Sequence, residues 1–190
     1  MRISCLVLLL VVLQCSLKNS CDYWEQFSMK ERESILFSAS TSNQERDFYF
    51  KKFEPSDDER TFSLLDLLTY NNNSSNTRAL HFYLFNNIAL NADGALAEVM
   101  GDYFVYWLKD NGAFVLRYLQ DHPQLEKVYL LNIGSAFYFG DQPLRYDEFK
   151  QTVTDQLGPN ELTYSIDFFH ELESILISFQ ETECSYRFLG

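Results

Sequence analysis

The chain has 190 residues, of which 46% are hydrophobic and 16% aromatic, and its formal net charge is −12 at pH 7. This hydrophobic content is far above that of a disordered protein, so the chain is expected to fold around a sizeable core. Nucleic-acid binding requires a basic surface that displaces counterions. The acidic charge therefore argues against nucleic acid and against anionic membrane surfaces as partners.

The first residues have the pattern of a secretory signal peptide. Arg2 gives a basic start, and the apolar stretch from Ile3 to Leu13 has the length of a signal-peptide core, whereas a membrane-spanning helix needs about 20 apolar residues. We therefore predict that residues 1–15 are a signal peptide and residues 16–27 an N-terminal linker. The expected location is extracytoplasmic, either secreted or lipid-anchored to the cell envelope.

Two ways of processing this leader are compatible with the sequence. Residues 12–15, Val-Leu-Gln-Cys, resemble a bacterial lipobox, in which the cysteine becomes lipid-modified and starts the mature chain. Gln14 departs from that pattern, which has a small residue before the cysteine. Simple cleavage near Ser16 or Ser20 is the alternative, since each offers one small residue. Lipidation of Cys15 would be the only link of this chain to a membrane.

The four cysteines predict one disulfide bond. Cys5 lies in the leader and Cys15 is either removed or acylated, which leaves Cys21 and Cys184 near the two ends of the mature chain. An even pair in an exported protein favours a bond between them. In the chain-entropy model, closing so long a loop stabilises the fold by about 4–5 kcal/mol. Two free, buried thiols are the alternative.

Residues 28–190 are predicted to form a single all-α domain, and capping signals mark its first helices. Serine stands three residues before glutamate at Ser28, Ser42 and Ser56, a spacing that permits a capping box. The aromatic run at 48–50 would also suit a short strand. The first predicted helices are 29–39, 43–53 and 57–70.

Beyond an asparagine-rich loop at 71–76, apolar residues recur at helical spacing. Gly112 is expected to break one helix, Pro123 to begin another and Gly158 to stop a third, while Asn160 is expected to cap the last. These later helices are predicted at 77–90, 94–109, 113–121, 123–138, 143–157 and 160–182. About nine short antiparallel helices with no fixed repeat predict a globular array rather than a regular solenoid.

The segment from Asp93 to Trp107 is the strongest candidate for a functional surface, because it combines carboxylates, glycines and large aromatics. Glu98 and Asp102 project away from its apolar face, which favours a solvated edge over a catalytic pair. Gly101 is expected to permit the close approach of a neighbouring helix. At about 100° per residue, the apolar stripe of this helix consists of Leu96, Met100, Tyr103 and Trp107.

Tyrosines provide a second group of candidates. A tyrosine ring can be buried while its hydroxyl reaches water, which suits helix seams and recognition surfaces alike, and core packing is the default interpretation. The tyrosines beside predicted turns, where an exposed groove could form, are Tyr118, Tyr129, Tyr138 and Tyr146. These four residues, together with Asp93, Glu98 and Asp102, are the predicted binding residues.

The sequence contains no complete metal-binding or catalytic motif. Asp167 precedes His170 by three residues, as in one half of a carboxylate-bridged di-metal site, but such a site needs two of these motifs. Neither His81 nor His122 has an acidic residue three positions earlier. Nucleophile elbows, phosphate-binding loops and dinucleotide fingerprints are missing as well. No metal and no cofactor are therefore predicted.

These observations favour an exported, non-catalytic binding or scaffold protein of the cell envelope or extracellular space. Its partner would be a protein or a small molecule. The alternative is a hydrolase or metal-dependent enzyme whose carboxylate site is built from Glu98 and Asp102. That alternative requires both side chains to converge with another polar group in a pocket.

Overall fold

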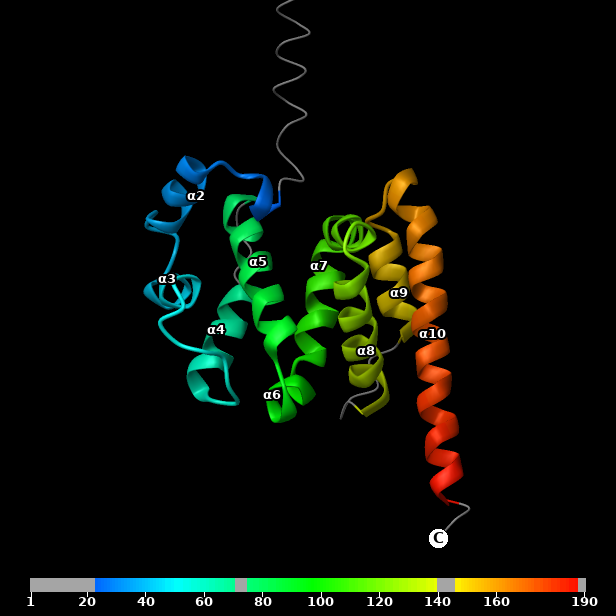
Figure 1. Ribbon diagram of the computed structural model, residues 1–190. Helices are drawn as coiled ribbons and strands as arrows, with labels where there is room; N and C mark the ends of the chain where they lie inside the picture. The colour runs from blue at the N-terminus through cyan, green and yellow to red at the C-terminus, as the bar shows by residue number, and fades with distance from the viewer. Residues whose placement is uncertain (1–22, 71–74, 140–145, 188–190) are drawn as a thin grey trace, which may run out of the picture. The chain divides into compact units, whose positions relative to one another are not determined.

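The computed structural model describes residues 23–70, 75–139 and 146–187, with side chains described for all of these except 75, 76 and 182–187. Every regular element in these ranges is helical, so the predicted all-α class is confirmed (Figure 1). In chain order the elements are the 3-10 helix η1 (Trp24–Gln26) and the α-helices α2 (Met29–Leu36), α3 (Asn43–Tyr49), α4 (Glu59–Tyr70), α5 (Ser75–Asn91), α6 (Gly94–Val99), α7 (Gly101–Gln120), α8 (Pro123–Phe139), α9 (Tyr146–Thr154) and α10 (Pro159–Arg187).

The helices divide into two compact units. Unit 1 contains the described residues up to Glu54 together with Asp66–Phe85, and unit 2 contains Pro55–Leu65 and the residues from Asn86 onward. The boundary between the units falls within α4 and within α5. The assignment of 28–190 to a single domain stays a prediction, because compactness alone does not establish that a unit folds by itself.

Two of the three predicted capping boxes are confirmed. Ser28 Oγ accepts a hydrogen bond from the backbone N–H of Glu31, whose carboxylate accepts one from the N–H of Ser28. Ser42 and Glu45 repeat this arrangement at the start of α3. The alternative of a strand at 48–50 is wrong, since α3 includes the first two of these residues.

The third predicted box, at Ser56 and Glu59, is wrong. Helix α4 begins at Glu59 itself, and the carboxylate of Asp58 caps it by accepting a hydrogen bond from the N–H of Thr61 at 2.7 Å. The hydroxyl of Thr61 in turn accepts a hydrogen bond from the N–H of Ser56. The bond from Thr61 holds the pKa of Asp58 below its usual range. Aspartate is as good a cap as serine, so the helix starts later than the serine predicts.

The single helix predicted over 94–109 is also wrong, because α6 and α7 are separate. Met100 lies between them with φ −73° and ψ −17°, close to the values of a tight 3-10 turn. The close approach predicted for Gly101 is confirmed. A Cβ atom at Gly101 would lie 2.8 Å from Ala136 Cβ and 2.9 Å from the carbonyl oxygen of Asn132, so α7 and α8 pack almost backbone to backbone.

The break predicted at Gly112 is a kink within α7. Asn111 leaves the helical region, with φ −136° and ψ 37°. The side chain of Gln156 restores the hydrogen bonds lost there: its carbonyl accepts from the N–H of Gly112 at 2.9 Å, and its amide donates to the carbonyl of Lys109. The separate helix predicted over 113–121 is therefore the second half of α7.

Helix α10 begins at Pro159, so the predicted cap at Asn160 is wrong. Proline occupies the first helical position, where its missing N–H is not needed. Glu161 reaches back to accept a hydrogen bond from the N–H of Gly158 at 3.1 Å. The same carboxylate accepts hydrogen bonds from Arg117, which joins α10 to α7 and lowers the pKa of Glu161.

Unit 2 is built around α7, which packs against α8, α9 and α10, and α10 also packs against α8 and α9 (Figure 1). Each of these four helices thus contacts at least two of the others, which makes the unit a packed helical array. Leu96, Met100 and Trp107 of the predicted stripe are buried. Tyr103, its fourth member, is only half-buried.

Candidate functional site

Unit 1 carries a groove with a volume of about 510 Å³ that is lined mainly by large apolar side chains. One wall comes from the chain just before α2, from α2 itself and from its end, and the other comes from the end of α3. We call the lining residues the aromatic groove: Phe27, Met29, Arg32, Glu33, Leu36, Phe37, Tyr49 and Phe50.

Three of the apolar groove residues are widely exposed to solvent. Met29 is 79% exposed, Phe37 66% and Phe50 47%. The rings of Phe37 and Phe50 stack with their centroids 6.2 Å apart, so α2 and α3 present one continuous apolar surface. Contiguous exposed apolar patches mark interaction sites, whereas scattered single residues do not.

The groove rests on a buried aromatic cluster. Trp24 is 1% exposed, and its ring contacts the rings of Phe27, Tyr49 and Tyr83 at centroid distances of 6.0, 5.8 and 6.1 Å. Two of these neighbours, Phe27 and Tyr49, belong to the groove itself. The two walls therefore share one packed support.

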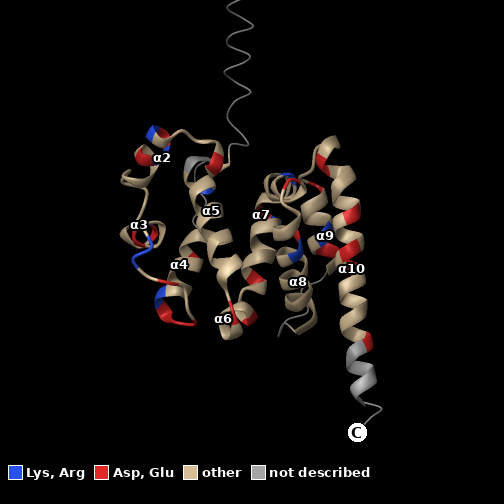
Figure 2. Ribbon diagram, in the orientation of Figure 1, with Lys and Arg blue, Asp and Glu red and all other residues tan. Residues whose placement is uncertain are grey.

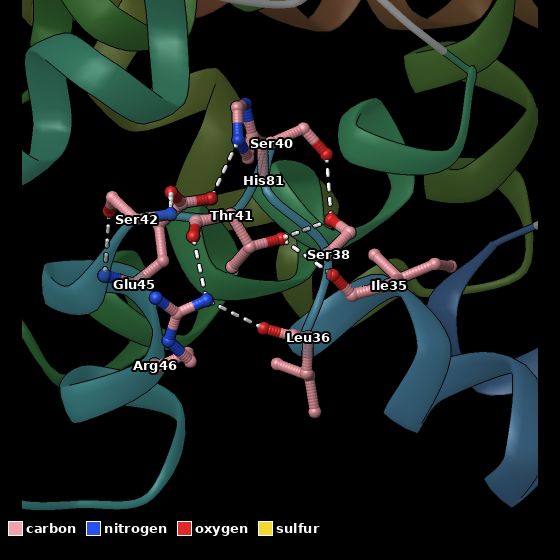
Figure 3. Close-up of polar contacts among 9 residues, drawn as sticks. All are labelled: Ile35, Leu36, Ser38, Ser40, Thr41, Ser42, Glu45, Arg46 and His81. Carbon is pink, nitrogen blue, oxygen red and sulfur yellow. Dashed lines mark hydrogen bonds and ion pairs between the residues drawn. The ribbon is translucent and has the colours of Figure 1, made fainter.

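Polar contacts of the α2–α3 connection hold the walls together (Figure 3). The guanidinium of Arg46 in α3 donates hydrogen bonds to the carbonyl oxygens of Leu36 and Thr41, at 3.0 and 2.7 Å. Thr41 Oγ1 donates to the carbonyl of Ile35 at 2.7 Å. Two of these bonds end on the carbonyls of Ile35 and Leu36 in the last turn of α2, where a helix leaves carbonyl groups without i+4 partners. They also fix Leu36, a groove residue, relative to α3.

A buried carboxylate–imidazole pair anchors α3 to α5 (Figure 3). Glu45 is 1% and His81 3% exposed, and Glu45 Oε1 lies 2.8 Å from His81 Nε2. The other carboxylate oxygen of Glu45 accepts a hydrogen bond from the N–H of Ser42 at 2.6 Å. Burial raises the pKa of Glu45, but the bonds from His81 and Ser42 outweigh burial and hold the pKa below its usual range. Neither member of the pair lines the groove, so the pair positions α3 and does not contact a groove ligand.

The chemistry of the aromatic groove suits binding. Phenylalanine, tyrosine, methionine and arginine are the residue types enriched in protein–protein interfaces. The two charged side chains of the aromatic groove are those of Arg32 and Glu33, which are adjacent residues of α2. The described lining offers neither a histidine base nor a serine or cysteine nucleophile, which general acid–base or covalent catalysis would use.

The predicted carboxylates lie at the surface of unit 2. Asp93 precedes α6, Glu98 belongs to α6 and Asp102 to the first turn of α7, and all three side chains are exposed. The turn at Met100 places Glu98 and Asp102 on different helices, so a helical angle no longer relates them. The structure does not bring these carboxylates into the aromatic groove.

Tyr118 and Tyr129 lie in the interior of unit 2. Tyr129 is fully buried, its hydroxyl donates a hydrogen bond to Asn86 Oδ1 at 3.0 Å, and burial raises its pKa well above the usual value. Tyr118 is 8% exposed and stacks on His122 with ring centroids 3.9 Å apart. Both side chains therefore contribute to packing.

Tyr138 and Tyr146 are half-buried in unit 2. The hydroxyl of Tyr146 donates to Glu173 at 3.3 Å, and Lys150 donates to the same carboxylate oxygen at 2.7 Å. Burial, followed by the negative charge of Glu173, raises the pKa of Tyr146. Tyr138 packs against Phe179 of α10, with ring centroids 5.5 Å apart. These contacts join helices. Tyr138 and Tyr146, like the other predicted binding residues, do not line the aromatic groove.

Three further sequence predictions concern metals and membranes. Asp167 and His170 are both exposed on α10. In the described part of the chain, no three histidine, cysteine, aspartate or glutamate side chains gather closely enough to hold a metal ion. Within the same part, none of the helices combines the length and apolar content that a membrane span requires.

The cysteine predictions lie outside the described residues. Cys15 and Cys21 precede residue 23, and the side chain of Cys184 is not among those described. The disulfide between Cys21 and Cys184 and the lipidation of Cys15 therefore stay predictions.

Sequence reasoning missed the aromatic groove because its residues do not follow a helical stripe. Helix α2 is short and mostly polar, and Phe27 and Phe37 lie just outside its two ends. Phe50 lies just beyond α3. The available signal was the position of large apolar residues beside helix ends. A search for helical periodicity does not evaluate these positions.

No protein-family model, curated protein or solved structure matches this chain. The function is therefore inferred from the groove and from the sequence.

Proposed function

We propose that the chain is an exported, non-catalytic binding protein that recognises a partner polypeptide through the aromatic groove. The observation that carries the proposal is the exposure of Met29, Phe37 and Phe50 around this groove. Full burial of a large apolar side chain is worth about 1.5–3 kcal/mol. A partner side chain inserted between these residues would gain part of that free energy, which supplies the driving force for binding.

A polypeptide suits this site better than a small molecule. Small-molecule sites enclose most of their ligand. Here the stacked rings of Phe37 and Phe50 and the side chain of Met29 extend to the open surface, where a broad partner can cover them. Methionine is flexible and polarisable, and it adapts to the shape of an incoming apolar side chain.

Export would place this binding activity outside the cytoplasm, as the leader at 1–15 indicates. Intact-mass analysis of the mature chain tests this part of the proposal. A diacyl mass on a chain starting at Cys15 would support lipid anchoring, and an unmodified start at Ser16 or later would support secretion. Retention of Met1 would contradict export. The same spectrum, recorded with and without reductant, tests the bond between Cys21 and Cys184.

Selection from a library of short random peptides, with the purified chain as bait, tests the groove. The selected peptides should bind the wild-type chain and lose about tenfold or more in affinity for the double variant Phe37→Ser/Phe50→Ser, because the apolar anchor loses its contacts. Phe139→Ser is the matched control. Phe139 is 69% exposed, like Phe37, but it ends α8 in unit 2. Isothermal titration calorimetry measures the affinities.

Two results would contradict the proposal. Peptides that bind the double variant as tightly as the wild type would place the binding surface elsewhere. A wild-type chain that sediments as a dimer, together with a monomeric double variant, would show that the groove is occupied by a second copy of the chain.

A further inference from the structure

We infer that the partner segment carries a carboxylate beside its apolar anchor and that Arg32 of the aromatic groove binds this carboxylate. The inference rests on the proposed function and names the chemistry of its ligand. It follows from the surroundings of Arg32, which hold the guanidinium in place at the groove without a carboxylate partner among the described residues.

The guanidinium of Arg32 is held against the support of the groove. It lies 5.8 Å from the ring centroid of Trp24, and its Nη2 donates a hydrogen bond to the backbone carbonyl of Glu25 at 2.8 Å. The side chain is half-buried and lines the groove. Its position is therefore set before a ligand arrives, which reduces the entropy lost on binding.

This guanidinium is only partly satisfied. Its Nε–H is buried and has no hydrogen-bond acceptor among the described residues, and the same holds for the neighbouring indole N–H of Trp24. The bond from Arg32 to Glu25 ends on a neutral carbonyl, and in the described ranges no carboxylate forms an ion pair with Arg32. A groove guanidinium without a carboxylate partner keeps its charge available, so a carboxylate of the partner can form a charge-assisted hydrogen bond with it.

Glu33, the other charged residue of the groove, has less influence on which ligand charge is preferred. Glu33 is exposed and hydrated, so pairing it with a cation of the partner contributes little. Glu31, which precedes Arg32 in the sequence, is already bound to Ser28 in the capping box of α2. The half-buried, positioned Arg32 therefore determines the charge of the preferred ligand group, and a planar guanidinium suits a carboxylate.

Unit 1 does not repel an acidic segment by its net charge. Its described residues include seven acidic and six basic side chains, a net charge of −1. Acidic residues next to an apolar anchor are thus the complementary partner chemistry.

The peptides selected on the wild-type chain provide the test. Aspartate or glutamate should recur within a few residues of an apolar anchor, and replacing that acid by its amide should weaken binding to the wild type about tenfold. Arg32→Gln should bind the acidic peptide and its amide with equal affinity. Arg32→Lys should keep part of the preference, because its charge remains while the planar fork is lost. Lys30→Gln, an exposed residue of the same helix with the same change of charge, should keep the full preference.

Three outcomes are distinguishable. If the wild type binds acid and amide peptides equally while Phe37→Ser/Phe50→Ser still weakens both, the carboxylate inference fails and the groove stands. If Arg32→Gln weakens both peptides by the same factor, Arg32 only supports packing and the inference also fails. If Phe37→Ser/Phe50→Ser leaves binding unchanged, the proposed function fails. Circular dichroism of each variant verifies that the helices are retained.

Discussion

Unit 1 and unit 2 differ in charge although both are helical. The described residues of unit 1 carry a net charge of −1, whereas those of unit 2 include 18 acidic and six basic side chains, a net charge of −12. Acidic side chains recur along α9 and α10 in unit 2 (Figure 2). The acidic charge of the whole chain is thus a property of unit 2, and it does not describe the surface on which the aromatic groove lies.

The units also differ in how their helices are held. In unit 2 small residues let helices approach closely: a Cβ atom at Gly134 would lie 2.9 Å from Ile175 Cγ2, much as Gly101 does with Ala136. In unit 1 the short helices α2 and α3 are joined by side-chain hydrogen bonds, and the exposed rings of Phe37 and Phe50 follow them. Under the proposed function, unit 2 is the packed scaffold and unit 1 carries the recognition surface.

The largest expected effect tests the packing of unit 2. Trp107 is fully buried, so Trp107→Ala should lower the free energy of unfolding by about 3–5 kcal/mol through lost contacts and a cavity. Urea unfolding followed by circular dichroism measures the change. Leu131→Ala, at a residue of α8 that is 54% exposed, is the control and should change stability by less than about 1 kcal/mol. A similar small loss for Trp107→Ala would show that unit 2 is not tightly packed.

The second effect tests the polar support of unit 1. Glu45→Ala should lower the free energy of unfolding by about 3 kcal/mol, because it removes the buried carboxylate bound to His81 and the reciprocal bond of the capping box of α3. A double-mutant cycle with His81→Ala should show that the double variant loses less than the sum of the single variants. Additive losses would mean that the two side chains act independently.

The third effect is the pH dependence of the same pair. Because the folded pKa of Glu45 lies below its usual value of 4.5, the pair stabilises the fold above pH 4.5, and this stabilisation is lost as the pH falls through the lowered pKa. The stability difference between the wild type and Glu45→Gln should therefore shrink below pH 4.5.

Glu161→Gln makes the corresponding comparison in unit 2. The bond from Arg117 lowers the pKa of Glu161, so its stability difference from the wild type should shrink in the same direction. Urea unfolding at a series of acidic pH values measures both differences. A difference that stays constant for Glu45→Gln but shrinks for Glu161→Gln would assign acid sensitivity to unit 2 alone.

The smallest expected effect concerns the surface of unit 2. Glu98→Gln and Asp102→Asn should each change the free energy of unfolding by no more than about 0.5 kcal/mol, since both side chains are exposed. They should also leave binding of the selected peptides unchanged. Loss of peptide binding in either variant would move the recognition surface from unit 1 to unit 2.

Local signals predicted much of the fold. The cap residues Ser28 and Ser42 identified two helix starts, because a cap depends on only four consecutive residues. The turn at Met100 was not predictable in this way, since it accompanies the packing of Gly101 on α8, which is a tertiary contact. The sequence predicted a helix break at Gly112 where the structure has a kink at Asn111. The difference arises because Gln156, whose side chain bridges the kink, is distant in sequence.

The candidate site was not predicted. The sequence directed attention to acidic and aromatic residues of unit 2, where Tyr129 proves to be a core residue. The exposure of Phe37 and Phe50 depends on where Arg46 and the Glu45–His81 pair hold α3, which are tertiary contacts. Amphipathic periodicity describes which face a helix buries, and it carries no information on residues that lie beyond helix ends.

The chain contains two tryptophans, and one lies in each unit: Trp24 in unit 1 and Trp107 in unit 2. Both are almost completely buried. Each unit therefore has its own tryptophan fluorophore. A Trp→Phe change in one unit produces a chain whose tryptophan emission comes only from the other unit. Coincident unfolding curves from the two single-tryptophan chains would mean one cooperative transition, and separated curves would mean two. Because Trp24 lies against Arg32, its emission would also report the filling of the groove while that of Trp107 stays unchanged.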